Sequence, residues 1–173
     1  ELSINLTDTF WDSILVEKFN TSAVSSPFWK TYLIAQIALN DNAFLSKDMK
    51  VRTLVEGRGD VHHIFPKNYL QKNGKNNKAV YNQIANFALI QTETNLQISD
   101  MSPEEYMQIV NTQCTSKGNE IGSINEKDNL LENLKINCIP ESLYLMNVDD
   151  YDSFLKQRRI LMAKKIKDYY NNI

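Results

Sequence analysis

Apolar residues recur every three or four positions along most of the chain, and this spacing predicts that helices dominate the fold. Two of the predicted helices carry clear start signals. Ser26-Pro27 and Ser102-Pro103 each supply a serine that caps the first turn and a proline at the first helical position. The segments with helical spacing cover residues 10–19, 27–39, 103–111, 127–137 and a long last stretch that ends near residue 169.

The remaining boundaries depend on polar residues. Glu105, three positions after Ser102, completes a capping box. Asp150 or Asp152 is expected to cap the last helix. Residues 117–125 are rich in glycine, serine and asparagine, which is typical of a loop.

Two short segments have the pattern of strands rather than helices. Residues 60–65 form the first candidate, ended by Pro66 because proline cannot donate to a ladder, and residues 87–91 form the second. The polar residues 73–77 between them favour turns. Thr92 then caps a short helix that carries Asn95 in its first turn. We therefore expect an α+β fold that is mostly α-helical, with helices surrounding a small strand–loop–strand–helix insert.

Length and composition fit one domain without a membrane segment. The 173 residues suffice for one hydrophobic core. The longest strongly apolar stretch, residues 32–39, is too short to span a bilayer, and no secretory signal opens the sequence. We expect a single domain over residues 1–173, located in the cytoplasm. Because the first residue is Glu1 rather than Met, we also expect a C-terminal fragment of a longer protein.

The basic charge is local although the net charge is −2. One cluster lies in a stretch without acids, and a second covers residues 156–167 and includes Arg158-Arg159. Local positive charge is what phosphate contact requires. The second cluster is equally well interpreted as the solvated face of a helix. The first consists of Lys67, Lys72, Lys75 and Lys78.

The only two histidines are adjacent, at His62 and His63. Imidazole serves as metal ligand or proton acceptor near neutral pH, so the pair suggests one residue for each task. In the alternative interpretation one histidine is packed and the other is solvated. Two asparagines downstream favour the chemical interpretation: Asn86 precedes the second apolar strand, and Asn95 comes nine positions later.

These residues carry a family resemblance. His-His-Ile-Phe-Pro at 62–66, together with Asn86 and Asn95, resembles the HNH nucleases, whose core is the ββα-metal finger. The sequence of residues 59–70 and 82–87 is similar to the C-terminal nuclease domain of GmrSD-type (DUF262/DUF1524) modification-dependent restriction proteins. The resemblance implies a finger core at about residues 58–100 and an NTP-hydrolysing, ParB-like domain N-terminal to this one.

The resemblance also implies residue roles. His63 aligns with the general base and Asn86 with the central asparagine that holds the base in place. His62 and Asn95 align with metal ligands. Asp60 shares a strand face with His62, so it ligates the ion, orients that histidine, or simply belongs to a turn. Both histidines reach one site only if the strand ends or bulges there.

The implied cofactor is one divalent cation. Asn95 suits Mg²⁺ or Mn²⁺, whereas His62 also suits Zn²⁺ or Ni²⁺. Some members of the superfamily have another helix ligand one turn later, where this chain has Ser99, a weak ligand. The sparse ligand set predicts weak metal binding before DNA arrives. Lys67 either contacts a phosphate near the site or is solvated.

Three functions are compatible with the sequence. The first is a metal-dependent DNA endonuclease that restricts modified or foreign DNA. The second is a non-catalytic nucleic-acid-binding module that retains the HNH fold. The third is a module that docks the missing N-terminal domain, with latent nuclease activity.

Overall fold

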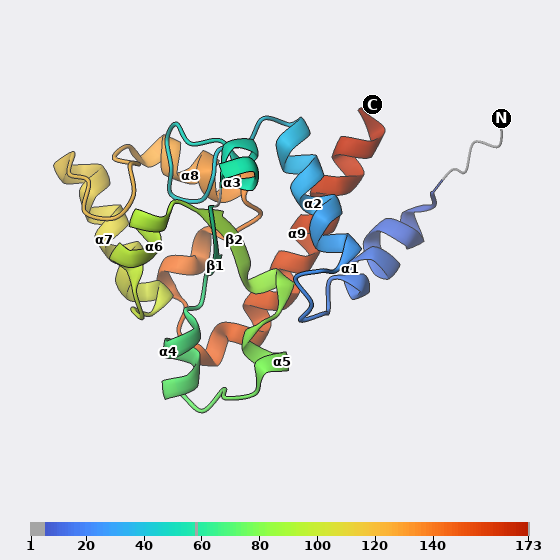
Figure 1. The fold of residues 1–173 in the computed structure, drawn as a ribbon, viewed down its shortest axis with the longest axis horizontal. Coiled ribbons are helices and arrows are strands. Elements are labelled where there is room, and N and C mark those ends of the chain that lie inside the picture. Colours follow the sequence, from blue (N-terminus) through green and yellow to red (C-terminus); the bar gives the residue numbers. More distant parts are fainter. Residues whose placement is uncertain (1–5, 58, 173) are drawn as a thin grey trace.

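The computed structural model describes residues 6–57 and 59–172, and these residues form a mostly helical molecule around one small sheet (Figure 1). The sheet has two antiparallel strands, β1 (Asp60–His63) and β2 (Phe87–Ile90). The predicted α+β class with mainly helical content is therefore confirmed. Glu1 and Arg58, at which the predicted domain and the predicted finger core begin, lie outside the described residues.

The helices fall into two groups by their place in the chain. Those between and after the strands are α4 (Lys67–Lys72), α5 (Lys78–Tyr81), the 3-10 turn η2 (Ile84–Asn86) and α6 (Thr92–Ile98). The surrounding elements are the π-helical turn η1 (Phe10–Ile14), α1 (Leu15–Lys18), α2 (Pro27–Ala38), α3 (Val51–Gly57), α7 (Pro103–Ser116), α8 (Lys127–Ile136), the 3-10 turns η3 (Glu141–Leu145) and η4 (Val148–Asp150), and α9 (Tyr151–Asn171).

Helix starts agree with the predicted capping chemistry in two cases. The Ser26 hydroxyl accepts from the Phe28 N–H at 3.3 Å, and the Ser102–Glu105 capping box is complete. Asp150 occupies the N-cap position of the last helix, as predicted, but its side chain forms no capping hydrogen bond with that helix. The Asp150 carboxylate instead accepts from the backbone N–H of Asn147 and so closes the turn η4 that leads into α9.

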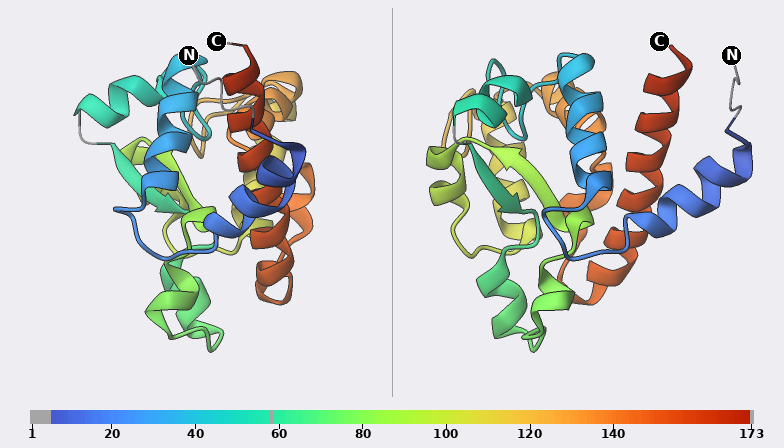
Figure 2. Two further views of the ribbon diagram at one scale, coloured as in Figure 1. Left: turned by 90° about the vertical axis from the view of Figure 1, so that its right-hand side faces the viewer. Right: turned by 45° about the vertical axis from the view of Figure 1, so that its right-hand side comes forward.

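One predicted helix end and three short helices differ from the sequence-based expectation. Helix α7 runs to Ser116, past the predicted end near residue 111, and stops where Lys117 adopts the left-handed region with φ of 60°. The helices α3, α4 and α5 were not predicted, because their four to seven residues are too few to show helical periodicity. In Figure 2 α4 and α5 lie side by side below the strands.

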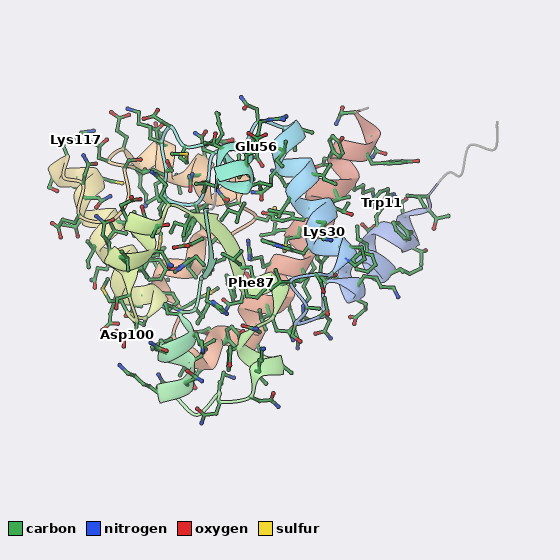
Figure 3. The ribbon with its side chains drawn as sticks, viewed as in Figure 1. Trp11, Lys30, Glu56, Phe87, Asp100 and Lys117 are labelled. Carbon is green, nitrogen blue, oxygen red and sulfur yellow. The ribbon has the colours of Figure 1, made fainter. Side chains whose placement is uncertain are left out.

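The pairing of the two strands fixes the place of each histidine. His62 lies opposite Ala88 and His63 lies opposite Phe87. All four residues of β2 are buried, whereas His62 is the single buried residue of β1. Phe87 lies among side chains at the centre of the molecule, while Glu56 and Lys117 lie at its edge (Figure 3). The sheet is therefore covered on the β2 side and accessible at the end of β1.

Helix α9 joins the outer helices to the strands. It packs against α2, α1 and η1, and also against the turn η2 that precedes β2 (Figure 1). Each of these elements contributes buried apolar residues to one cluster, which runs from Trp11 to Ile166 along the sequence. Trp29 and Phe87 meet edge to face within it, with ring centroids 5.9 Å apart.

Arg158 is the unexpected member of this core. It is fully buried, although the basic residues of this segment were predicted to be a solvated face or a DNA contact. Its guanidinium donates to the carbonyls of Ala85 at 2.8 Å and Phe87 at 2.6 Å, and to that of Asn137 at 3.3 Å. Both interpretations are therefore wrong for Arg158, whose two terminal guanidinium nitrogens donate to backbone carbonyls inside the protein.

We predict that Arg158→Met destabilises the protein by about 3–5 kcal/mol, because it removes the side-chain donor to the buried carbonyls of Ala85 and Phe87, whereas the Asn137 carbonyl still accepts from the Tyr32 hydroxyl. Lys156→Met is the matched control, since Lys156 lies exposed on the same helix. Urea unfolding monitored by circular dichroism measures both. Equal midpoints for the two variants would contradict the structural role assigned to Arg158.

Candidate functional site

Asp60, His62 and Asn95 form a hydrogen-bonded chain between β1 and α6. Asp60 and His62 lie on one face of the strand, as their spacing of two predicts. The Asn95 side chain meets both of them: its Oδ1 lies 2.7 Å from His62 Nδ1, and its Nδ2 donates to Asp60 at 3.2 Å. The three residues predicted as the metal group are therefore brought together, with Asn95 rather than His62 contacting Asp60.

His62 is a buried, neutral histidine in this arrangement. Only 3% of it is exposed, and its ring lies between those of Phe44 and Tyr106. Since an amide oxygen can only accept, Nδ1 carries the proton and Nε2 is left unprotonated. Nε2 is buried and has no hydrogen-bond partner within the described part of the chain. Burial lowers the pKa of His62 from 6.5 to about 4, although the hydrogen bond with Asn95 opposes this shift.

His63 lies at the end of β1. Its Nε2 lies 2.9 Å from Oδ1 of Asn82, and its ring meets the edge of Phe87 with centroids 5.0 Å apart. Burial lowers the pKa of His63, while the hydrogen bond with Asn82 raises it. The strand ends at His63, which is the condition predicted for both histidines to reach one site.

Both histidines line one shallow cleft of about 250 Å³. The cleft lies where β1, the start of α4 and helix α6 meet, so it contains residues from the strand, the adjoining turn and the helix. Asp60 and Asn86 are not part of its lining. The full lining is Val61, His62, His63, Pro66, Lys67, Asn68, Asn95 and Ser99.

Asn86 is fully buried beside the cleft and holds the backbone that leads on from His63. Its side chain accepts from the Phe65 N–H at 2.8 Å and donates to the carbonyls of Phe65 at 3.1 Å and Tyr81 at 3.3 Å. Its carbonyl accepts from the Ile64 N–H at 2.8 Å. Asn86 therefore ties the end of β1 to the segment before β2, and among the described residues its side-chain hydrogen bonds go to backbone groups rather than to the His63 ring.

The donor set could hold one divalent ion only after the His62–Asn95 hydrogen bond opens, because the unprotonated Nε2 of His62 is buried and lies across the ring from the nitrogen that contacts Asn95 Oδ1. His62 offers an unprotonated nitrogen, and Asn95 offers an oxygen next to the same ring; both residues line the cleft. Among the described residues no group of three or more His, Cys, Asp or Glu side chains is placed to hold a metal. Water and substrate oxygens would therefore have to complete the coordination.

The four predicted DNA-binding lysines do not form one patch. Lys67 lines the cleft, with its ammonium 5.5 Å from the centroid of the Tyr81 ring. Lys72 is ion-paired with Asp100. Lys75 lies 3.5 Å from a carboxylate oxygen of Asp152 and also faces the ring of Tyr151. Lys78 is exposed at the first turn of α5.

Sequence reasoning missed two residues that position the site. Asn82 contacts His63, and Tyr106 donates its hydroxyl to the Ile64 carbonyl at 2.9 Å. No spacing rule identifies Asn82, because its partner lies 19 positions earlier across the connector. Tyr106 is fully buried, so its hydroxyl bond to Ile64 lies within the core.

Comparison with known proteins gives no relative: no family model, curated protein or solved structure matches this chain. Within residues 6–57 and 59–172, no helix has the length and apolar character needed to cross a membrane.

We predict that acid weakens the folded state through His62. Its pKa is about 4 when folded and near 6.5 when unfolded, so the unfolded chain binds more protons between these values. The stabilising contribution of neutral His62 to the free energy of unfolding is therefore fully present above pH 6.5. As the pH falls towards 4, about 3 kcal/mol of it is lost. Urea unfolding in chelator at about pH 7 and about pH 4 measures this loss. The free energy of unfolding should fall less between the two pH values for His62→Gln than for the wild type. An identical loss would mean that His62 is not buried as a neutral ring.

Proposed function

We propose that this protein is a metal-dependent DNA endonuclease of the HNH type, acting in restriction of modified or foreign DNA. One observation carries the proposal: His62, His63 and Asn95 line a single cleft at the junction of an antiparallel strand pair and the helix after it. Two adjacent histidines in different environments suit two different roles. The resemblance of residues 59–70 and 82–87 to GmrSD-type nuclease domains supports the same conclusion.

His63 is the proposed general base, because it lines the cleft and its ring is held by Asn82 and Phe87. His62 and Asn95 would hold the ion, with Asp60 fixing the Asn95 amide. A bound divalent ion would supply charge relief on the phosphoryl oxygens and on the departing 3′ oxygen. The chain's own task is then to accept the proton of the attacking water and to keep that water and the phosphate in the cleft.

The four lysines differ in how readily each could contact DNA. Lys67 is the lysine next to the histidines, so it is the proposed phosphate contact within the site. Lys72 and Lys75 already face acids, and DNA would have to displace Asp100 and Asp152 to use them. Lys78 is exposed on α5, which lies beside α4, and suits a peripheral contact.

A non-catalytic nucleic-acid-binding module is the second candidate. It is favoured by the hydrogen bond between His62 and Asn95, which occupies the Asn95 oxygen that an ion would need. In that case the cleft is a structural remnant and the basic residues carry the function. A role in docking another protein domain would likewise need no ion.

We predict that purified protein nicks plasmid DNA in Mg²⁺ or Mn²⁺ and that His63→Ala lowers the rate by about 10²–10⁴-fold. The control Lys30→Ala changes an exposed residue of α2 and should cleave at the wild-type rate. Thermal melts monitored by circular dichroism check that both variants are folded. Wild-type activity in His63→Ala, or wild-type protein that is inactive with every divalent ion, would contradict the nuclease assignment.

Lys67→Ala should weaken DNA binding and lower the log–log salt slope by about one unit, because one phosphate contact is lost. Lys156→Ala, on the exposed side of α9, should leave the slope unchanged. Fluorescence anisotropy with a labelled duplex across a salt series measures both, in chelator to prevent cleavage. Equal losses in the two variants would place α9 on the DNA as well.

A further inference from the structure

Within the described residues, the Asn82 amide is the only side chain found in a hydrogen bond with His63. Its Oδ1 lies 2.9 Å from Nε2 of the ring. An amide oxygen carries no hydrogen, so Nε2 must be the donor. The neutral ring then has its lone pair on Nδ1.

Asn82 is itself held firmly at the end of α5. Its backbone N–H donates to the Lys78 carbonyl at 3.0 Å. The carbonyl of the preceding residue, Tyr81, accepts from the Asn86 amide. Two residues further on, the Ile84 N–H donates to the Thr21 carbonyl at 2.9 Å. The amide is thus presented to His63 from a backbone that is fixed on both sides.

Two aromatic rings also contact the His63 ring. Phe87 meets it edge to face at 5.0 Å, and Tyr81 lies tilted to it at 6.3 Å between centroids. These contacts restrict where the ring lies. They do not distinguish one ring nitrogen from the other, because a hydrocarbon edge neither donates nor accepts a conventional hydrogen bond.

We propose that Asn82 is the positioning residue that fixes the tautomer of His63, with Nε2 protonated and Nδ1 free to accept a proton. This inference rests on the proposed nuclease function, in which His63 is the base. It also assigns different roles to Asn82 and Asn86. Asn86 holds the backbone around Phe65, whereas Asn82 holds the ring of His63.

The tautomer has a direct chemical consequence. When water attacks the phosphorus, a water oxygen–phosphorus bond forms and the bond to the 3′ oxygen breaks. The water proton moves to Nδ1 of His63, and the departing 3′ oxygen takes a proton from solvent. During this step the Nε2–H stays on Asn82, so the imidazolium that forms keeps its hydrogen-bond partner. With the other tautomer Nδ1 would already carry a proton and could not act as the base.

Nitrogen-15 NMR of the two imidazole rings tests the assignment without any need for cleavage. The chain has only two histidines, so His62→Gln assigns the His63 signals. The spectra are recorded in chelator at a pH where both rings are neutral. In the wild type they should show His63 protonated on Nε2. Asn82→Asp keeps an oxygen acceptor and should show the same tautomer. Asn82→Leu and Asn82→Ala remove the acceptor and should give mixed tautomers. Asn76→Leu, at an exposed asparagine of the same connector, should match the wild type.

Plasmid cleavage supplies the functional measurement. Asn82→Leu and Asn82→Ala should lower kcat by about 10²-fold with little change in KM, since a misplaced base affects the chemical step rather than binding. Asn82→Asp, which keeps the acceptor, should retain most of the wild-type kcat. An unchanged His63 tautomer in both acceptor-free variants, or a wild-type His63 protonated on Nδ1, overturns the role of Asn82. Wild-type protein that cleaves nothing while the tautomers shift as expected overturns the nuclease function alone.

Discussion

The arrangement of the site depends on the hydrogen bonds that the buried Arg158 guanidinium donates to backbone carbonyls at and just before the start of β2. The guanidinium reaches from α9 to the carbonyls of Ala85 and Phe87, which lie on either side of Asn86. Among the described residues no carboxylate forms an ion pair with it, so backbone dipoles compensate the charge. Removing a buried donor leaves buried acceptors unpaired, and that penalty fixes the terminal helix to the strands.

From this contact a continuous set of bonds leads to the cleft. Asn86, held between the two carbonyls that Arg158 binds, holds Phe65 through its side chain and Ile64 through its backbone. Tyr106 of α7 donates to the carbonyl of Ile64. The end of β1 is thus held from α9, α7 and the connector together. A cleft whose histidines must keep fixed rings is best built on such a frame, because packing and hydrogen bonds determine each side-chain orientation.

The two histidines show how environment separates two chemically identical side chains. His62 is enclosed between aromatic rings, so its charged form is disfavoured and it stays neutral. His63, at the strand end, is less enclosed and has an amide partner of its own. A neutral nitrogen suits an ion, and an oriented ring suits proton transfer, which is the division of roles in the proposed nuclease.

The sequence by itself determined the mainly helical class, the two strands, the capped starts of α2 and α7, and the grouping of Asp60, His62 and Asn95. These features depend on local periodicity, capping chemistry and a family-like spacing, all of which can be read along the chain. Only the tertiary structure decided that Arg158 is buried, that Lys72 and Lys75 face acids, and that Asn82 holds His63. These contacts join residues 19 to 77 positions apart, and a side chain's partner at such separation is set by packing rather than by local pattern.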